Sequence, residues 1–525
     1  MEQKKITNKK NNLFNNSKKS ILNVIFSRFV LIALFLFLQI AFILVFLIEF
    51  ETYLPQFYSF NIVLSVFLLL YLINTQIDPT AKLTWLVLFT VFPVFGALLF
   101  GYTLSDFGHR ALKKRTDNIK KNTMFALDHN ASTLEKLSKI DNRASNICKY
   151  LQKCGCHPLY DNTSVKYLKS GEVMFEELLK AIKSAEKYIF MEYFIIEHGK
   201  MWQEILDVLA EKAASGVDVR VIYDGRCEFS MLPHSYPKTL GEMGIKCKVF
   251  APIMPFLSTH YNYRDHRKIT VVDGKTAFTG GINIADEYIN AKKRFGYWKD
   301  CAIMLCGQAA ESFALMFMQM WNVERGANDF SFIKNDVQND VSENVFVMPY
   351  SDCPLDNDKV GERVYVDMLN RSEKYVHIMT PYLILDCVTE NAIKFAAERG
   401  VEVSVVLPGI PDKKIPYALA KSHYSSLISS GVKIYEYTPG FLHSKVVVSD
   451  DKEAVVGTIN LDYRSLYHHF ECAAYIYGKD AVAEIETDFE DTVNQSKTVT
   501  AQTAKNEKIS TKLLGFLMKI LAPLL

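Results

Sequence analysis

The sequence predicts an α/β protein with two pseudo-twofold-related halves, each an α-β-α sandwich, behind a hydrophobic N-terminal region. Between about residues 125 and 500, helical stretches alternate with short runs rich in Val and Ile, the pattern of helices packed on a largely buried sheet. The same order of segments occurs twice there, whereas most of the long apolar runs lie in the first hundred residues. A chain of 525 residues has ample length for more than one folding unit.

The composition excludes several classes of protein. Hydrophobic residues make up 49% of the chain, which rules out disorder for its bulk. The 60 Lys and Arg residues nearly balance the 58 Asp and Glu residues, so no overall positive field attracts nucleic acid, and we expect no such partner. The ten cysteines are scattered without the spacing of a disulfide framework or a zinc ribbon, which favours a reducing compartment.

The N-terminal region is expected to enter a membrane. Residues 1–28 form a basic arm, and 29–104 hold three apolar runs. The first run, 29–48, contains no charged residue until Glu49 and has about the length that crosses the roughly 30 Å hydrocarbon layer as a helix. Lys and Arg residues precede the first run and follow the third, so the positive-inside rule places both flanks in the cytoplasm.

Two crossings, together with a third segment that is re-entrant or lies at the membrane interface, would satisfy this orientation. The third run, 83–102, contains Pro93 and Gly96, which predict a break in its helix. A helix buried in a soluble core is the alternative for this run. We therefore expect a multi-pass protein with two to three hydrophobic segments and its soluble bulk on the cytoplasmic side.

The C-terminal residues 501–525 predict an amphipathic helix. Apolar residues such as Leu513 and Phe516 alternate with Lys512 and Lys519 at helical spacing. Such a helix lies on a membrane surface or packs on the body of the protein, and the sequence leaves both readings open.

An internal repeat divides the soluble region. The segment SAEKY at Ser184 recurs as RSEKY at Arg371, and each leads into an apolar run. The segment SGVDVRVIYD at Ser215 likewise matches RGVEVSVVLPG at Arg399. Each copy predicts a helix that stops at Gly and is followed by a buried strand. We therefore expect a duplicated domain, with a first repeat and its leading linker in 105–330 and a second repeat in 331–500.

The strongest functional signal is a doubled motif of His-x-Lys followed by Asp at the eighth position. HRKITVVD and HSKVVVSD each continue into a Gly and an Asn at identical spacing. Independent placement of residues would produce about 0.05 such matches, so chance is a poor explanation. On a strand, His and Lys at i and i+2 project from the same face. The candidate catalytic residues are His266, Lys268, Asp273, His443, Lys445 and Asp450, and the candidate phosphate-binding residues are Asn283 and Asn460.

Two imidazoles and two ammonium groups facing each other suit one phosphate diester. The lysines neutralise its nonbridging oxygens, and the asparagines donate hydrogen bonds to them. One His attacks phosphorus, giving a phosphohistidine, while the other protonates the leaving alcohol. We expect no metal or other cofactor, since a protonated Lys is not a metal ligand. Asp273 and Asp450, at the ends of the motif strands, are expected to fix local structure.

These residues resemble the duplicated HKD signature of the phospholipase D superfamily and, within it, the bacterial cardiolipin synthases. The similarity covers essentially the whole chain, including HYNYRDHRKITVVDGKTAFTGGINIADEYI, FLHSKVVVSD and VGTINLDYRS. Lys299 stands where such proteins often carry Arg, and His468-His469 replaces a more usual Leu-Asn.

The resemblance implies the phospholipase D fold and an enzyme of the bacterial cell membrane. Its reaction would transfer a phosphatidyl group from one phosphatidylglycerol to another, giving cardiolipin and releasing glycerol. The resemblance also implies that one histidine, usually that of the first motif, is the nucleophile, and that Asp300 and Glu471 orient the two rings. Its partners would be phosphatidylglycerol and cardiolipin in the bilayer, and the sequence leaves a homo-oligomer open.

Four other functions use or explain the same residues. A membrane-bound phospholipase D that hydrolyses lipid, or another phosphatidyltransferase, would need the same His and Lys pairs. A nuclease of the superfamily is disfavoured by the balanced charge and the hydrophobic N-terminal region. A lipid-binding scaffold without activity has no chemical need for His, Lys and Asn twice over.

Overall fold

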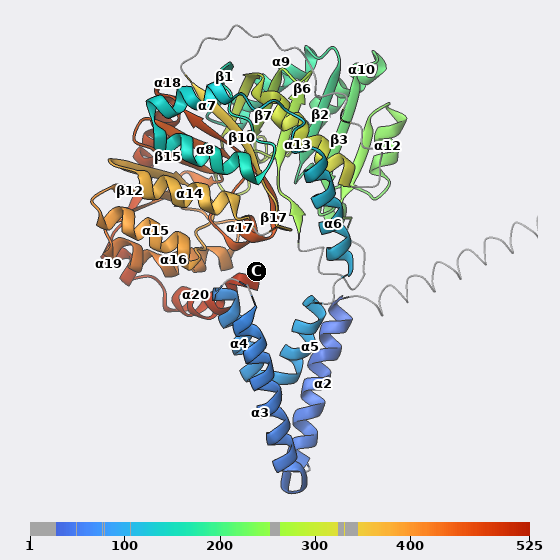
Figure 1. Ribbon diagram of the computed structural model, residues 1–525, viewed down its shortest axis with the longest axis vertical. Coiled ribbons are helices and arrows are strands. Elements are labelled where there is room, and N and C mark those ends of the chain that lie inside the picture. The colour runs from blue at the N-terminus through green and yellow to red at the C-terminus, as the bar shows by residue number, and fades with distance from the viewer. Residues whose placement is uncertain are drawn as a thin grey trace, which may run out of the picture. The chain divides into compact units, whose positions relative to one another are not determined.

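The computed structural model describes residues 28–524 except 49, 76, 78, 105–106, 253–262, 324–329, 331–344 and 357 (Figure 1). The described chain forms two compact units. The smaller lies mainly within residues 1–112, and the larger comprises most of 113–523. The smaller unit contains one large apolar cluster, and the larger unit contains two.

The smaller unit is helical. Its helices are α2 (Arg28–Ile48), α3 (Phe50–Asn74), α4 (Pro79–Val91) and α5 (Pro93–Leu104). The chain reverses direction between α4 and α5. The contact between the rings of Trp85 and Phe100 shows this reversal, since their centroids lie 4.8 Å apart although the residues are fifteen positions apart in the sequence. Pro93 begins α5 at the break, and Gly96 lets α5 approach α4, since an added Cβ would lie 3.0 Å from the Leu88 carbonyl oxygen.

The expected membrane crossings in 29–104 are not supported. Within the part of the chain that the structure describes, no helix combines the length and the apolar character needed to cross a membrane. The third apolar run is divided between α4 and α5, with 13 and 12 residues, each shorter than the roughly 20 residues that a crossing requires.

The larger unit begins with three helices and the first repeat. The leading helices are α6 (Phe107–Asn122), α7 (Ala131–Ile140) and α8 (Asn142–Cys154). The first repeat comprises β1 (Thr163–Leu168), α9 (Gly171–Lys183), β2 (Tyr188–Tyr193), α10 (Lys200–Ala214), β3 (Asp218–Asp224), α11 (Cys227–Ser230), α12 (Tyr236–Glu242), β4 (Lys246–Phe250), β5 (Arg264–Asp265), β6 (Lys268–Val272), β7 (Thr276–Gly280), β8 (Tyr297–Lys299), β9 (Ala302–Gly307) and α13 (Ala309–Val323).

The second repeat follows the same plan. It comprises β10 (Phe346–Asp352), α14 (Val360–Arg371), β11 (Tyr375–Met379), α15 (Cys387–Glu398), β12 (Glu402–Pro408), α16 (Lys414–Ser429), β13 (Lys433–Tyr437), β14 (Gly440–Leu442), β15 (Val446–Ser449), β16 (Glu453–Gly457), α17 (Tyr463–Tyr467), β17 (His469–Tyr477) and α18 (Lys479–Asn494). The chain then continues through β18 (Ser496–Val499), α19 (Ala501–Lys505), α20 (Ile509–Leu521) and the 3₁₀ turn Ala522–Leu524.

The sheet orders confirm the predicted duplication. The first sheet runs β1-β9-β7-β6-β2-β3-β4, and the second runs β10-β17-β16-β15-β11-β12-β13-β18. In each sheet the three strands beginning with β2 or β11 are parallel, and the motif strand β6 or β15 pairs antiparallel to the first of them. The mixed α/β fold with two repeats is therefore the one expected from the alternating helices and Val/Ile runs.

The strands of each sheet are buried on both sides because helices cover both faces of the sheet. In β2, Ile189 and Met191 join the core formed with α9 and α10. Phe190, which points the other way, stacks on Phe317 of α13 at 4.6 Å. In the second repeat, the equivalent His377 stacks on Phe489 of α18 at 4.3 Å.

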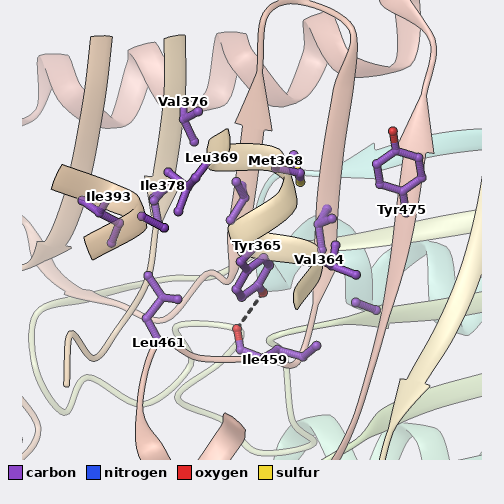
Figure 2. Close-up of a cluster of buried hydrophobic side chains, with 14 of the residues drawn as sticks. Val364, Tyr365, Met368, Leu369, Val376, Ile378, Ile393, Ile459, Leu461 and Tyr475 are labelled. Carbon is purple, nitrogen blue, oxygen red and sulfur yellow. Dashed lines mark hydrogen bonds between the residues drawn. The ribbon is translucent and has the colours of Figure 1, made fainter. Parts of the chain in front are cut away.

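The core of the second repeat reaches across the repeat boundary. Figure 2 shows Val364, Tyr365 and Met368 of α14 among the apolar residues of this core. Leu137 of α7 and Leu151 of α8 belong to the same core, although both helices precede the first repeat in sequence. The segment before the first repeat thus stabilises the second.

Candidate active site

Two short strand pairs bring the motifs of the two repeats together. β5, which leads into His266, pairs with β17 of the second repeat, and the His266 N–H donates to the Phe470 carbonyl oxygen at 3.0 Å. β14, which leads into His443, pairs with β8 of the first repeat, and the His443 N–H donates to the Lys299 carbonyl oxygen at 2.7 Å. Each motif histidine is therefore anchored by backbone from the other repeat.

The carboxylates are exchanged in the same way. Nδ1 of His266 lies 2.8 and 3.0 Å from the two carboxylate oxygens of Glu471. Nδ1 of His443 lies 2.7 Å from Oδ2 of Asp300. All four side chains are buried. When the Nδ1–H group donates a hydrogen bond to the carboxylate, the lone pair lies on Nε2, so each ring presents a nucleophilic nitrogen on its free side.

The two carboxylates are held by different means. The Thr458 hydroxyl donates to Glu471 Oε2. At the equivalent place in the first repeat stands Gly281, and a Cβ there would lie 2.0 Å from Asp300 Oδ1. The shorter Asp side chain therefore occupies space that any other residue at 281 would fill, and the N–H of Cys301 donates to it at 2.8 Å.

The two lysines provide positive charge beside the rings. Nζ of Lys268 donates to the His266 carbonyl oxygen at 2.5 Å, and Nζ of Lys445 donates to the His443 carbonyl oxygen and lies 2.9 Å from Nδ1 of His443. Burial lowers the pKa of Lys268 to about 7 and that of Lys445 to about 8. The two ammonium groups also repel each other, which contributes to the lowered pKa of Lys268.

Both histidines are neutral near pH 7. Burial holds the pKa of His266 well below its usual value, with Lys268 acting in the same direction and Glu471 opposing it. Burial and then Lys445 lower the pKa of His443 to about 4. Burial alone would raise the pKa of Asp300, but His443 and Lys445 outweigh it and the pKa is lowered. The site therefore holds neutral imidazoles paired with ionised carboxylates.

Asp273 and Asp450 hold the backbone where the first parallel strand of each repeat begins, and a catalytic role for either carboxylate stays a prediction. Asp273 accepts hydrogen bonds of 2.7–2.8 Å from the N–H groups of residues 186, 187 and 188, and Asp450 accepts equivalent bonds of 2.8–2.9 Å from those of 373, 374 and 375. Each carboxylate thus holds the chain where β2 or β11 begins. The motif strand separates it from the His and Lys. Their structural role was the one expected from their position at the strand ends.

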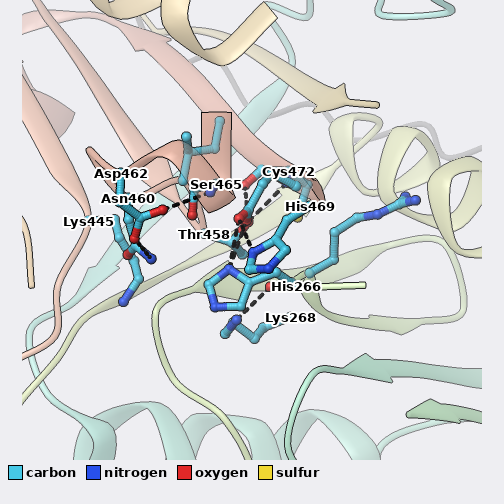
Figure 3. A network of polar contacts seen from close by, with 12 residues as sticks. His266, Lys268, Lys445, Thr458, Asn460, Asp462, Ser465, His469 and Cys472 are labelled. Carbon is cyan, nitrogen blue, oxygen red and sulfur yellow. Dashed lines mark hydrogen bonds and ion pairs between the residues drawn. The ribbon is translucent and has the colours of Figure 1, made fainter. Parts of the chain in front are cut away.

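The two asparagines that follow the motifs are buried. Asn283 accepts from the Ile195 N–H at 3.0 Å and donates to the Tyr288 hydroxyl at 2.7 Å. Asn460 donates to Asp462 at 3.3 Å, and its Oδ1 has no hydrogen-bond partner among the described residues. Figure 3 shows Asn460 and Asp462 with Lys445, and Asp462 acts electrostatically on that lysine. Binding of phosphate by these amides stays a prediction.

Aromatic rings pack against both imidazoles. No sequence motif predicted most of these rings as part of the site. Phe194 makes an edge contact with His266 at a centroid distance of 4.9 Å. Tyr288, Trp298 and Phe441 lie 5.5–5.7 Å from His443. Tyr288 and Trp298 belong to the first repeat and reach His443 only because the repeats pair, whereas Phe194 and Phe441 lie in the same repeat as the histidine that they contact.

Comparisons with known proteins agree with this geometry. A family model described as "Cardiolipin synthase, PLD-like domain" matches residues 178–306 and 365–493, and each match contains one motif. A protein of Streptococcus mutans serotype c, described as uncharacterized, is 53% identical over 461 residues, covering 87% of this chain and 99% of that protein. A cardiolipin synthase of Alkalihalophilus pseudofirmus is 32% identical over 460 residues, covering 85% of this chain and 89% of that protein.

A solved structure shows the same fold. The crystal structure of phosphatidylserine synthase from Haemophilus influenzae matches with a TM-score of 0.55 at 15% sequence identity, covering 73% of this chain and 98% of that chain.

The duplicated α/β fold and the two His-Lys pairs define a phosphodiester-transferring enzyme of the phospholipase D type. Among these enzymes, the chain belongs to the family of bacterial cardiolipin synthases in the phospholipase D superfamily, and it is a phosphatidyltransferase.

Proposed function

We propose that the chain synthesises cardiolipin by transferring a phosphatidyl group from one phosphatidylglycerol to another, with release of glycerol. The observation that carries this proposal is the exchange of carboxylates between the repeats. It gives two neutral imidazoles, each oriented through Nδ1, with two ammonium groups beside them.

The reaction proceeds by two displacements at phosphorus. Nε2 of one histidine, His266 by resemblance to the family, attacks the phosphorus of the first phosphatidylglycerol. The phosphodiester anion favours uptake of a proton by Nε2 of His443 when it binds. The P–N bond then forms as the bond to the glycerol oxygen breaks, and protonated His443 gives this proton to the leaving glycerol. A terminal hydroxyl of the second phosphatidylglycerol then gives its proton to His443 and attacks phosphorus. The P–N bond breaks, and one phosphodiester has replaced another without consumption of a nucleotide.

The remaining site residues stabilise charge during both steps. The arriving phosphodiester carries the negative charge that favours protonated Lys268 and Lys445, and both can contact its nonbridging oxygens. We expect Asn283 and Asn460 to donate hydrogen bonds to the same oxygens. Asp300 and Glu471 stabilise the positive charge that develops on the rings.

Transfer is favoured over hydrolysis by the aromatic rings around the site. Three rings pack around His443 and one on His266, which limits the room for water next to a phosphohistidine. A phospholipase D that hydrolyses lipid is the second candidate, because it uses the same residues. The two functions differ in which hydroxyl reaches phosphorus.

We further propose that the larger unit works at a lipid surface. α20 packs on α16 through Gly515, where a Cβ would lie 2.5 Å from the Ala418 carbonyl oxygen. Its other side exposes Leu513, Phe516 and Leu517 at 52–69% of their surface, with Lys512 and Lys519 on the same helix. An apolar stripe flanked by lysines suits the interface of an anionic bilayer. The cytoplasmic side, expected from the charged flanks, stays a prediction.

The products formed from phosphatidylglycerol alone test the proposed function. Purified enzyme should convert vesicles of this lipid into cardiolipin and an equal amount of free glycerol, as measured by lipid separation and a glycerol assay. Phosphatidic acid as the main product would replace the synthase with the hydrolase.

Two histidine variants test the shared site. His266→Ala and His443→Ala should each lower the rate by at least about 1,000-fold, because neither ring can act without the other. His198→Ala is the matched control, since this exposed histidine also has a lysine two residues later. More than about a tenth of the wild-type rate in either motif variant would contradict a single shared site.

A further inference from the structure

A third imidazole lies against the proposed nucleophile. The ring centroids of His266 and His469 are 5.1 Å apart, and Nδ1 of His469 lies 3.5 Å from Oε1 of Glu471 (Figure 3). His469 is 8% exposed, and its Nδ1 makes no well-formed hydrogen bond to any residue that the structure describes. Burying a nitrogen without such a bond costs free energy of folding, and a ligand bound to this nitrogen would offset that cost. The Nδ1 atom of His469 is therefore available for a ligand.

The other half of the site has no imidazole at the equivalent place. His469 pairs in register with Arg264, two residues before His266, and Trp298 pairs with Phe441, two residues before His443. The two positions are therefore equivalent. The His443 half works with an indole where the His266 half has an imidazole, so the chemistry shared by the two halves does not need His469.

His266, His469 and Glu471 together form a set of zinc donors. One ligand atom from each lies within 4.8 Å of the other two, and all three residues are buried. Two nitrogens and one carboxylate oxygen are the donors of many zinc sites that keep a fourth position open. Around a tetrahedral zinc with bonds of about 2.0–2.1 Å, ligand atoms lie about 3.3 Å apart. The 2.8 and 3.5 Å separations to Glu471 need only small adjustments.

We propose that these three side chains bind Zn²⁺ and that the bound ion switches the enzyme off. This regulation rests on the proposed function, because the ion takes the histidine that would attack phosphorus. Coordination by Nδ1 of His266 displaces its proton, which moves to Nε2. The lone pair that forms the P–N bond is then lost, and Glu471 no longer orients the ring. Lys268, beside His266, repels the ion and limits its affinity.

Cobalt and zinc titrations of the full-length protein test this site. Co²⁺ added to metal-free protein should give the visible absorption of a tetrahedral ion at one equivalent per chain, and Zn²⁺ should displace it. Zn²⁺ should also inhibit cardiolipin formation over the concentration range in which it displaces Co²⁺, and EDTA should restore the rate.

Variants of two adjacent histidines separate this site from general metal binding. His469→Asn and His469→Gln should remove the cobalt spectrum and raise the zinc concentration for half-inhibition at least about tenfold. The neighbouring His468→Asn should change neither, and it is the matched control. Each variant is compared with itself with and without metal, so a change in its basal rate does not affect the result.

Three results would overturn the proposal: no tetrahedral cobalt spectrum, binding without inhibition, or equal inhibition of wild type and both His469 variants. The cobalt spectrum does not depend on the lipid reaction. A protein that binds Co²⁺ through His469 but makes no cardiolipin would therefore refute the proposed function and leave the metal site intact.

Discussion

At the scale of single residues, the two halves orient their histidines with different parts. The second repeat uses the longer Glu471 with a hydroxyl from Thr458, and the first uses Asp300 pressed against the backbone at Gly281. The Gly281 position is therefore intolerant of any side chain, although its backbone angles are not in the left-handed region.

Gly281→Ala should lower activity at least about 100-fold while the protein stays folded. The added methyl must displace the Asp300 carboxylate, which leaves His443 without its partner. The matched control is Gly241→Ala, because a Cβ there meets nothing within 4 Å. Rates of cardiolipin formation and circular dichroism measure the two effects. Near-normal activity of Gly281→Ala would show that Asp300 does not orient His443.

The loss of activity at alkaline pH should reflect the loss of positive charge from Lys268 and Lys445. Each lysine is charged below its pKa and neutral above it, and these pKa values are about 7 for Lys268 and about 8 for Lys445. Because kcat/KM reflects the free enzyme, it should fall as pH rises through 7 and 8. The substrate phosphodiester does not titrate in this range. A profile that is flat from pH 6 to 10 would contradict the loss of lysine charge.

The motif residues could be predicted from the sequence, whereas their partners could not be derived from spacing. His266, Lys268, His443 and Lys445 share a spacing that chance rarely produces twice. The carboxylates stand 205 and 143 positions from the histidines that they contact. Resemblance to a family suggested Asp300 and Glu471, but only the structure shows that each carboxylate serves the ring of the opposite repeat.

At the scale of elements, regular strands and helices were predictable where the apolar period is strong. The motif strands β6 and β15 fall in the runs ITVV and VVVS, which are rich in β-branched residues. The exchanged strands β5 and β8 have only two or three residues, and nothing local specifies them. They form because a partner strand from the other repeat satisfies their backbone groups.

The C-terminal helix α20 should insert its apolar side into the bilayer interface. A tryptophan introduced as Phe516→Trp should shift its fluorescence to the blue on addition of phosphatidylglycerol vesicles and be quenched by brominated lipid. Phe229→Trp is the matched control, because Phe229 is equally a large exposed side chain but lies on α11. Unchanged emission at position 516 would show that α20 stays in water.

At the scale of the whole molecule, segments that are neighbours in the sequence do not always belong to the same hydrophobic core. α7 and α8 precede the first repeat but contribute to the core of the second. The sequence shows that α8 has an apolar side, yet it cannot show which sheet that side covers, because both repeats offer similar surfaces.

Leu151→Ala should therefore destabilise the second repeat by about 2–5 kcal/mol, the usual cost of truncating a fully buried leucine. Thermal unfolding followed by circular dichroism measures the change. Ile140→Ala is the control, because Ile140 is 64% exposed at the end of α7. Equal melting temperatures for the Leu151 variant and wild type would show that α8 is not part of this core.

The exchange of strands and carboxylates also determines what duplication achieves here. Two similar copies of a domain are commonly redundant, so that the second still functions when the first is damaged. In this enzyme each copy keeps the support for its neighbour's imidazole and depends on the neighbour for its own. Damage to either copy is therefore expected to inactivate both halves of the site.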